Sequence, residues 1–113
     1  MKEIKAIIKP ATLENVLVAL RQVEGLPGIT LSEVKGFGKT KKAIFKEKSL
    51  DEILKHEDKI KLEIVVPDEL AESTIRAIEE NARTGGKGDG KIFVSEILDV
   101  VKIRTGERGR CGI

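Results

Sequence analysis

The sequence predicts an α+β fold in which a four-stranded antiparallel sheet carries two helices on one face. Three observations support this prediction. Residues 2–9 and 59–66 alternate between apolar and charged residues with the period of a β-strand. Each of these segments runs into a proline and then into an apolar pattern with helical spacing. A further strand candidate follows each helix, so the order βαβ occurs twice.

In the first half of the chain, the strand over residues 2–9 leads into a helix after Pro10. The apolar residues of the strand are Ile4, Ala6 and Ile8, and those of the helix are Leu13, Val16, Leu17, Leu20 and Val23. Thr12 is the expected N-cap of this helix, and Gly25 marks its end. Residues 30–37 then predict the second strand.

The second half repeats this order. The apolar residues of the strand over 59–66 are Ile60, Leu62, Ile64 and Val66, and those of the helix after Pro67 are Ala71, Ile75, Ile78 and Ala82. Asp68 is the expected N-cap of this helix, and Gly85 marks its end. The last strand is expected over residues 91–94, continuing through residues 97–104.

This order of elements is the split βαβ, or ferredoxin-like, arrangement, a βαββαβ sandwich with both helices on one face of the sheet. The other face is then left bare. Because the strands are rich in Ile, Val and Leu and the chain has only three aromatic residues, the bare face does not suit a stacking ligand. We expect it to be buried against copies of the same chain in a homo-oligomer.

Length and composition predict one domain over residues 1–113. The 21 basic and 19 acidic side chains leave a net charge of +2, which does not favour a nucleic-acid partner. A single cysteine, Cys111, excludes an intrachain disulfide. The first ten residues do not form a signal peptide, and no segment approaches the roughly 20 apolar residues of a membrane span. We therefore expect a cytoplasmic protein with no direct membrane insertion.

Residues 84–91, TGGKGDGK, match the phosphate-loop pattern GxxxxGK but lack the Ser or Thr that should follow. Ile92 stands at that position, and the order is helix, loop, strand instead of strand, loop, helix, so a nucleotide-hydrolysing loop is not expected. The glycines can instead point successive backbone N–H groups into an anion-binding concavity, with Lys87 and Lys91 beside it. The simpler alternative is a glycine-rich turn.

Residues 35–38, KGFG, match the start of the RNP1 signature of RNA-recognition domains. The signature should continue with aromatic residues, whereas this chain continues with Lys39 and Thr40. Three phenylalanines, with no tyrosine or tryptophan, leave no stacking platform for bases. RNA binding is therefore disfavoured.

The connection between the second and third strands, residues 39–58, has no clear core pattern. Connections of this length inside a compact domain are usually functional or disordered. Two interpretations stay open at this point: an effector loop that contacts a partner, and a solvent-exposed mobile hairpin tip.

Five motifs, taken together, resemble the P-II family of nitrogen regulatory signal proteins. They are KAIIKP at 5–10, EVKGFG at 33–38, LEIVVPDEL at 62–70, TGGKGDGKIFVS at 84–95 and IRTGERG at 103–109. The resemblance implies a ferredoxin-like subunit, a compact homotrimer, and ATP or ADP, with or without Mg, in the clefts between subunits. It also implies a non-enzymatic regulator of nitrogen utilisation whose mobile loop, here residues 39–58, docks onto a membrane transporter or a metabolic enzyme.

The resemblance also assigns roles to single residues, none of them catalytic. Gly36, Phe37 and Gly38 match the base of the mobile loop, where it passes the nucleotide. Thr84, Gly88, Asp89, Gly90 and Lys91 match the nucleotide loop, in which Lys91 pairs with phosphate. Arg104 matches an arginine that reaches across from the neighbouring subunit. Lys39 and Lys102 stand where the family usually has arginine, so charge is kept and bidentate geometry is lost.

The chain departs from the family at ligand and modification positions. Members that sense 2-oxoglutarate use a glutamine after the KGFG stretch to hold magnesium; here that residue is Thr40, with a shorter side chain. Lys59, which matches the lysine that pairs with the oxo-acid carboxylate, is present. Binding of 2-oxoglutarate therefore stays open. The tyrosine that is uridylylated in some members is replaced by Glu52.

Residues 24–30, EGLPGIT, are one residue longer than expected of the common type. This is similar to a variant branch with a divergent mobile loop, so the alternative function is regulation of a different membrane transport system in response to another small ligand or a metal. His56 and Cys111 are candidate metal ligands, but two ligands without a spacing signature do not define a site. No metal site is therefore expected.

Overall fold

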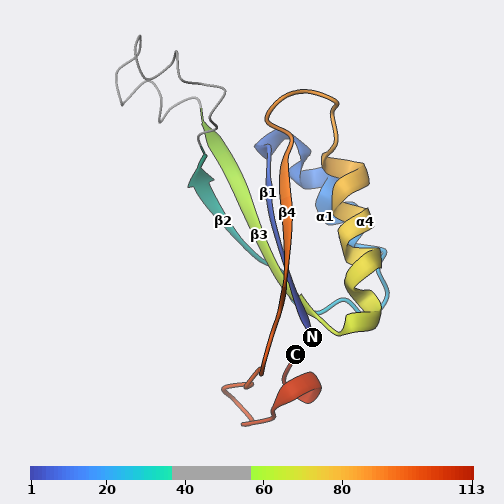
Figure 1. Cartoon of the computed structure of the whole chain (residues 1–113), viewed down its shortest axis with the longest axis vertical. Helices are drawn as coiled ribbons and strands as arrows, with labels where there is room; N and C mark the ends of the chain where they lie inside the picture. Colours follow the sequence, from blue (N-terminus) through green and yellow to red (C-terminus); the bar gives the residue numbers. More distant parts are fainter. Residues whose placement is uncertain (37–56) are drawn as a thin grey trace.

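The computed structural model describes residues 1–36 and 57–113 and confirms the ferredoxin-like α+β fold (Figure 1). The main elements are β1 (Lys2–Ile8), α1 (Leu13–Arg21), β2 (Thr30–Lys35), β3 (Asp58–Val66), α4 (Ala71–Ala82) and β4 (Gly90–Glu96). Short 3₁₀ helices are η1 (Pro10–Thr12), η3 (Asp68–Leu70) and η4 (Gly109–Gly112). The sheet has the order β2-β3-β1-β4, and every neighbouring pair is antiparallel. Both helices cover the same face of the sheet.

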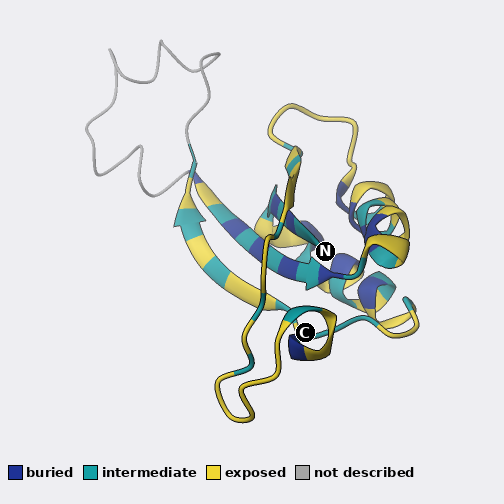
Figure 2. Ribbon diagram, turned by 60° about the horizontal axis from the view of Figure 1, so that its bottom comes forward, coloured by how far each residue is buried: buried dark blue, intermediate teal, exposed yellow. Residues whose placement is uncertain are grey.

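The core lies between the helices and the two central strands. Alternate residues of β1 and β3 are buried, which appears in Figure 2 as regular stripes along the strands. Val16 and Leu20 of α1 and Ile78 of α4 are fully buried against them. The apolar periodicity of the sequence therefore identified the inward faces correctly, because one buried face sets period 2 in a strand and period 3.6 in a helix.

The helix starts differ in part from the prediction. Thr12 is the N-cap residue of α1, but its hydroxyl donates to the carbonyl of Lys9 at 2.9 Å instead of capping the helix. The prediction for Asp68 was wrong, because η3 takes up the first turn and Leu70 becomes the N-cap of α4. The carboxylate of Asp68 accepts from the N-terminal amine at 2.9 Å, which lowers its pKa.

The strand ends also needed correction. β3 begins at Asp58, one residue earlier than predicted, so Asp58 is not part of the loop. Asp58 pairs with Lys35 of β2. β4 ends at Glu96, so the predicted continuation through residues 97–104 was wrong. Residues 97–113, the C-terminal segment, instead turn back at Gly106, whose φ is +75°. Its amide donates to the carbonyl of Lys102 at 2.7 Å, and only the bridge between Val101 and Arg108 is strand-like among the described residues of this segment.

The free face of the sheet is more charged than the sequence suggested. Positions between the buried ones in β1 and β3 include Glu3, Lys5, Lys61 and Glu63, all half-buried. Lys5 and Glu63 lie directly opposite each other in the antiparallel register. Most aliphatic side chains of these strands point to the helices instead. In the described part of the chain, no helix has the length and apolar character needed to cross a membrane.

Candidate functional site

The glycine loop, residues 84–91, joins the end of α4 to β4 and closes over one end of the sheet (Figure 1). Gly90 pairs with Ile8, the last residue of β1, so the loop lies beside the point where β1 passes into η1. The strand order also brings the start of β3 to this end of the sheet, because β3 runs antiparallel to β1.

Three of the four glycines are required by the backbone. Gly85, Gly88 and Gly90 have φ values of +86°, +87° and +101°. At Gly90 a Cβ atom would lie 1.7 Å from the carbonyl oxygen of Ile7, so no other residue fits there without movement of the loop or of β1. The fourth glycine, Gly86, does not have a positive φ. The backbone of the loop therefore requires glycine at three positions.

Asp89 organises the first half of the loop. Its carboxylate accepts from the amides of Thr84 at 2.8 Å and Gly85 at 2.9 Å, and from the hydroxyl of Thr84. Lys9 brings its ammonium group to 3.1 Å from the same carboxylate. The hydrogen bonds from the Thr84 hydroxyl and amide, followed by those from Lys9 and Gly85, hold the pKa of Asp89 far below its usual range.

This geometry modifies the expected anion-binding concavity. The amides of Thr84 and Gly85 are used by Asp89, and the amide of Gly86 donates to the Thr84 hydroxyl at 3.2 Å. Within residues 1–36 and 57–113, the amides of Lys87 and Gly88 have no hydrogen-bond acceptor. The first half of the loop is therefore closed on itself, and the second half is the part with donors for an anion.

Lysines from several elements surround the loop. Lys59, at the start of β3, donates to the carbonyl of Gly88 at 3.0 Å. Lys87 and Lys91 are exposed on the loop itself. Lys9 belongs to the KAIIKP motif, but the sequence assigned it no role at the site; its contact with Asp89 places it there. The sequence places Lys9 at the end of the first strand, but it does not show which strand pairs beside it, so the contact with the glycine loop could not be predicted. Lysines on and beside the loop favour a bound anion, although the charge of Lys9 is paired with Asp89.

Gly36 connects the site to the base of the 39–58 loop. Its amide donates to the carbonyl of Glu57 at 2.9 Å. A Cβ atom on Gly36 would lie 3.1 Å from Cγ of Lys59, so Gly36 is packed on the lysine that reaches Gly88. The other predicted residues of this stretch, Phe37, Gly38 and Lys39, lie outside the described residues, as does most of the 39–58 loop.

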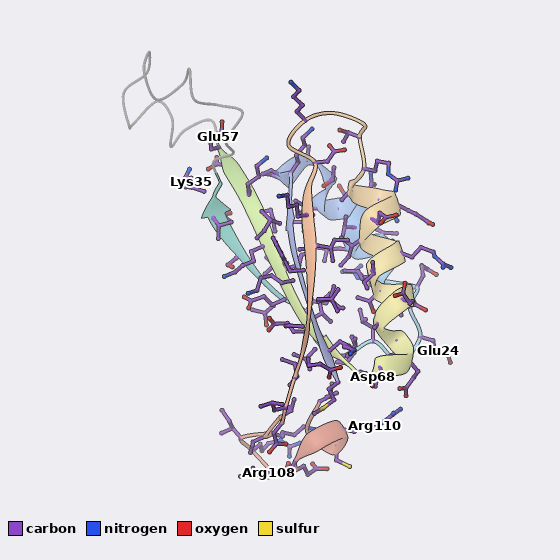
Figure 3. The ribbon with its side chains drawn as sticks, in the orientation of Figure 1. Glu24, Lys35, Glu57, Asp68, Arg108 and Arg110 are labelled. Carbon is purple, nitrogen blue, oxygen red and sulfur yellow. The ribbon has the colours of Figure 1, made fainter. Side chains whose placement is uncertain are left out.

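The structure does not bring Lys102 and Arg104 to the glycine loop of their own chain. They belong to the C-terminal segment, at the opposite end of the sheet (Figure 1). Figure 3 shows the same separation, with Arg108 and Arg110 at that end and Lys35 and Glu57 at the other. Lys102 and Arg104 can reach such a loop only in another copy of the chain.

A pocket of about 390 Å³ lies between α4 and β4, next to the loop. Its wall is mainly aliphatic and includes Ile75, Ile78 and Ile92, with Arg83 and Lys91 as its basic residues. Arg83 is already paired with Glu79 at 2.9 Å. The hollow therefore suits apolar groups better than phosphate. In the described parts of the chain, no group of three or more potential metal ligands occurs, and His56 lies outside them.

The fold and the loop together define a ferredoxin-like subunit with a candidate anion site at the end of its sheet. The family model described as "Nitrogen regulatory protein P-II" matches residues 1–107, and the chain belongs to this family. It is 49% identical over 109 residues to "Nitrogen regulatory protein P-II" of Rhizobium meliloti, covering 96% of each chain. "Nitrogen regulatory protein P-II 1" of Methanothermobacter thermautotrophicus is 48% identical, covering 100% of this chain and 97% of the relative. The protein of that name from Escherichia coli K12 is 43% identical over 100% of both chains.

Proposed function

We propose that this P-II family chain is a homotrimeric regulator of nitrogen utilisation that binds ATP or ADP in the clefts between subunits. Residues 39–58 are proposed to dock onto a membrane transporter or a metabolic enzyme. The observation that carries the proposal is the glycine loop: its first half is closed on itself, and its second half presents the free amides of Lys87 and Gly88 beside Lys59, with Lys87 and Lys91 exposed on the loop.

Phosphate binding in this proposal uses the second half of the loop. The amides of Lys87 and Gly88 and the ammonium of Lys91 are the donors, since backbone amides and lysines are the usual phosphate ligands of such loops. Lys102 and Arg104 complete the site from a neighbouring subunit. Ile103, between them, is 99% exposed in its own chain, which supports burial of this segment against another copy.

Regulation follows from a physical link between nucleotide and effector loop. Lys59 touches Gly88 on one side and packs against Gly36 on the other. ATP and ADP differ at the γ-phosphate, and a difference in their contacts near Lys39 and Lys59 biases the 39–58 loop between docked and undocked populations. Only such a differential contact can shift this equilibrium.

The proposal is a regulator and not a nucleotide hydrolase. The relatives are named regulatory proteins. The carboxylate that follows the proposed phosphate donors in the loop, Asp89, is held by Thr84, Gly85 and Lys9, and its lowered pKa makes it a weak general base. Steady release of phosphate from ATP by the purified protein would contradict this part of the proposal.

Titration calorimetry of the purified protein with MgATP and then ADP tests the function. Lys91→Ala should weaken binding by at least tenfold while the oligomer stays intact, because it removes a charge-assisted phosphate contact. Lys2→Ala, at the far end of β1, is the matched control and should bind normally. A Lys91→Ala variant that binds like the unmodified protein would refute the assignment of this site.

The same titration with 2-oxoglutarate decides what is sensed. If 2-oxoglutarate binds only together with ATP, the protein reports nitrogen status in spite of Thr40. If ATP binds and 2-oxoglutarate adds nothing, the protein reports the ratio of ATP to ADP. Both outcomes are consistent with the proposed nucleotide site. If neither ATP nor ADP binds, the proposed site is refuted.

A further inference from the structure

We propose that Lys9 is a positioning residue for the glycine loop: it holds Asp89 and Thr84 in place, so that the second half of the loop stays open for phosphate. This inference rests on the proposed nucleotide site. It assigns a role to a residue that lies outside the loop and that does not itself need to touch the nucleotide.

The backbone of Lys9 is fixed where β1 ends. Its carbonyl accepts from the amide of Thr12 at 3.1 Å and from the hydroxyl of Thr12 at 2.9 Å. Thr12 is buried, so this anchor is shielded from water. The side chain therefore leaves the sheet from a defined point and in a defined direction.

The ammonium of Lys9 reaches two acceptors of the loop. It lies 3.1 Å from Oδ1 of Asp89 and 3.2 Å from Oγ1 of Thr84. The side chains of Lys9 and Asp89 are only 30% and 22% exposed, so the pair is partly desolvated. Asp89 also accepts from Thr84 and Gly85, and the ammonium of Lys9 adds a positive partner to this partly buried carboxylate.

Lys9, Thr84 and Asp89 contact one another in a closed hydrogen-bond network. Thr84 donates its hydroxyl to Asp89 and accepts from both Lys9 and the amide of Gly86. At the other end of the loop, Gly90 lies against the carbonyl of Ile7, two residues before Lys9. The loop is thus held to the end of β1 at both ends, by Lys9 at Thr84 and by backbone packing at Gly90, and Asp89, which lies next to Gly90, also pairs with Lys9. Without Lys9, Asp89 and Thr84 lose a shared donor, and the first half of the loop can rearrange.

Lys9 and Lys59 differ in this respect. Lys59 donates to the carbonyl of Gly88, in the half of the loop with free amides. Lys9 donates to the side chains of Asp89 and Thr84, and its stem also lies beside Gly88, where a Cβ atom would be 3.6 Å from Cε of Lys9. Because the ammonium of Lys9 is used by Asp89 and Thr84, we expect Lys9 to act through Asp89, and its effect on ligand binding should vanish when Asp89 can no longer pair with it.

A double-mutant cycle with Lys9→Met, Asp89→Asn and the double variant tests this inference through the ADP dissociation constant. Lys9→Met should raise the constant about tenfold, by analogy with the lower end of the range seen when groups that orient metal ligands are removed. The double variant should bind no more weakly than Asp89→Asn alone. Lys9→Arg should bind almost normally, and Lys2→Met is the control. Additive effects, which a direct contact between Lys9 and nucleotide would produce, overturn the inference.

A second readout needs no nucleotide. In the ¹H–¹⁵N spectrum of the free trimer, Lys9→Met should shift the amide resonances of Thr84 and Gly85, while Lys2→Met leaves them in place. Unchanged Thr84 and Gly85 resonances in a folded Lys9→Met variant overturn the positioning role. If the unmodified protein does not bind ADP, the proposed function fails, and this spectrum still decides the role of Lys9.

Discussion

Two features of the structure require glycine at position 90: a left-handed backbone conformation and close contact with β1. Its φ is +101°, and a Cβ atom there would meet the carbonyl group of Ile7 in the adjacent strand. Gly85 has a similar φ of +86° but nothing within 4 Å of the Cβ position. The two glycines therefore separate the cost of the backbone conformation from the cost of the clash.

Replacing these glycines by alanine should give unequal losses of stability. Gly85→Ala should lower the free energy of unfolding by about 1 to 2 kcal/mol, the usual cost of left-handed backbone for an alanine. Gly90→Ala should cost clearly more, since the loop or β1 must also move. Chemical denaturation of both variants measures the difference. Equal losses would contradict the close approach to Ile7.

Because of Asp89, the free energy of unfolding should depend on pH under acidic conditions. Its folded-state pKa lies below the ordinary value, so its stabilising contribution is present above the unfolded pKa of about 4 and is lost as the pH falls towards the folded pKa. Asp89→Asn removes the titrating group. The stability difference between the unmodified protein and this variant should therefore shrink on acidification below about pH 4. A difference independent of pH would contradict the depressed pKa.

At the scale of elements, α4 connects the core to the glycine loop. Ile78 is fully buried beneath this helix, whereas Glu72 on its first turn is exposed. The helix ends at Ala82, directly before the loop begins. Packing of α4 on the sheet therefore determines where the loop starts.

Ile78→Ala should lower the free energy of unfolding by about 2 to 5 kcal/mol, because the truncation leaves a cavity under α4. Glu72→Ala, on the exposed side of the same helix, should change it by less than about 0.5 kcal/mol. Urea titrations followed by circular dichroism measure both. Similar values for the two variants would show that α4 is not packed as described.

At the scale of the whole molecule, the single subunit has features that a monomer would not need. Leu98 and Ile103 of the C-terminal segment are 98% and 99% exposed. Phe93 on β4 is also half exposed. Large apolar side chains left in water at this level are typical of surfaces that another chain covers. They support the proposed homotrimer.

Replacing Leu98 and Ile103 by serine should weaken the oligomer with little effect on the fold of the subunit. Each side chain contributes about 1.5 to 3 kcal/mol when it is fully buried, so dissociation should occur at a higher protein concentration. Sedimentation equilibrium measures this shift, with Val18→Ser on α1 as the control. An oligomer of unchanged strength would show that these residues lie outside the interface.

The sequence by itself determined the inward faces of β1, β3, α1 and α4, and it identified the glycine loop. Those features depend on local periodicity and on glycine, whose effects act over a few residues. It failed at the end of β4, where Gly106 turns the chain and contacts within the C-terminal segment replace sheet pairing. The start of α4 was also missed, since η3 precedes the helix.

Only the tertiary structure decided which side chains meet at the loop. Lys9 and Lys59 are fifty residues apart in the sequence, and the antiparallel pairing of β1 and β3 brings both to Gly88 and Asp89. The bonds from Thr84 and Gly85 to Asp89, and with them the division of the loop into a closed and an open half, also depend on the tertiary structure. Such contacts leave no periodic pattern in the sequence, because they are set by strand order and register, which the long-range packing of the sheet selects.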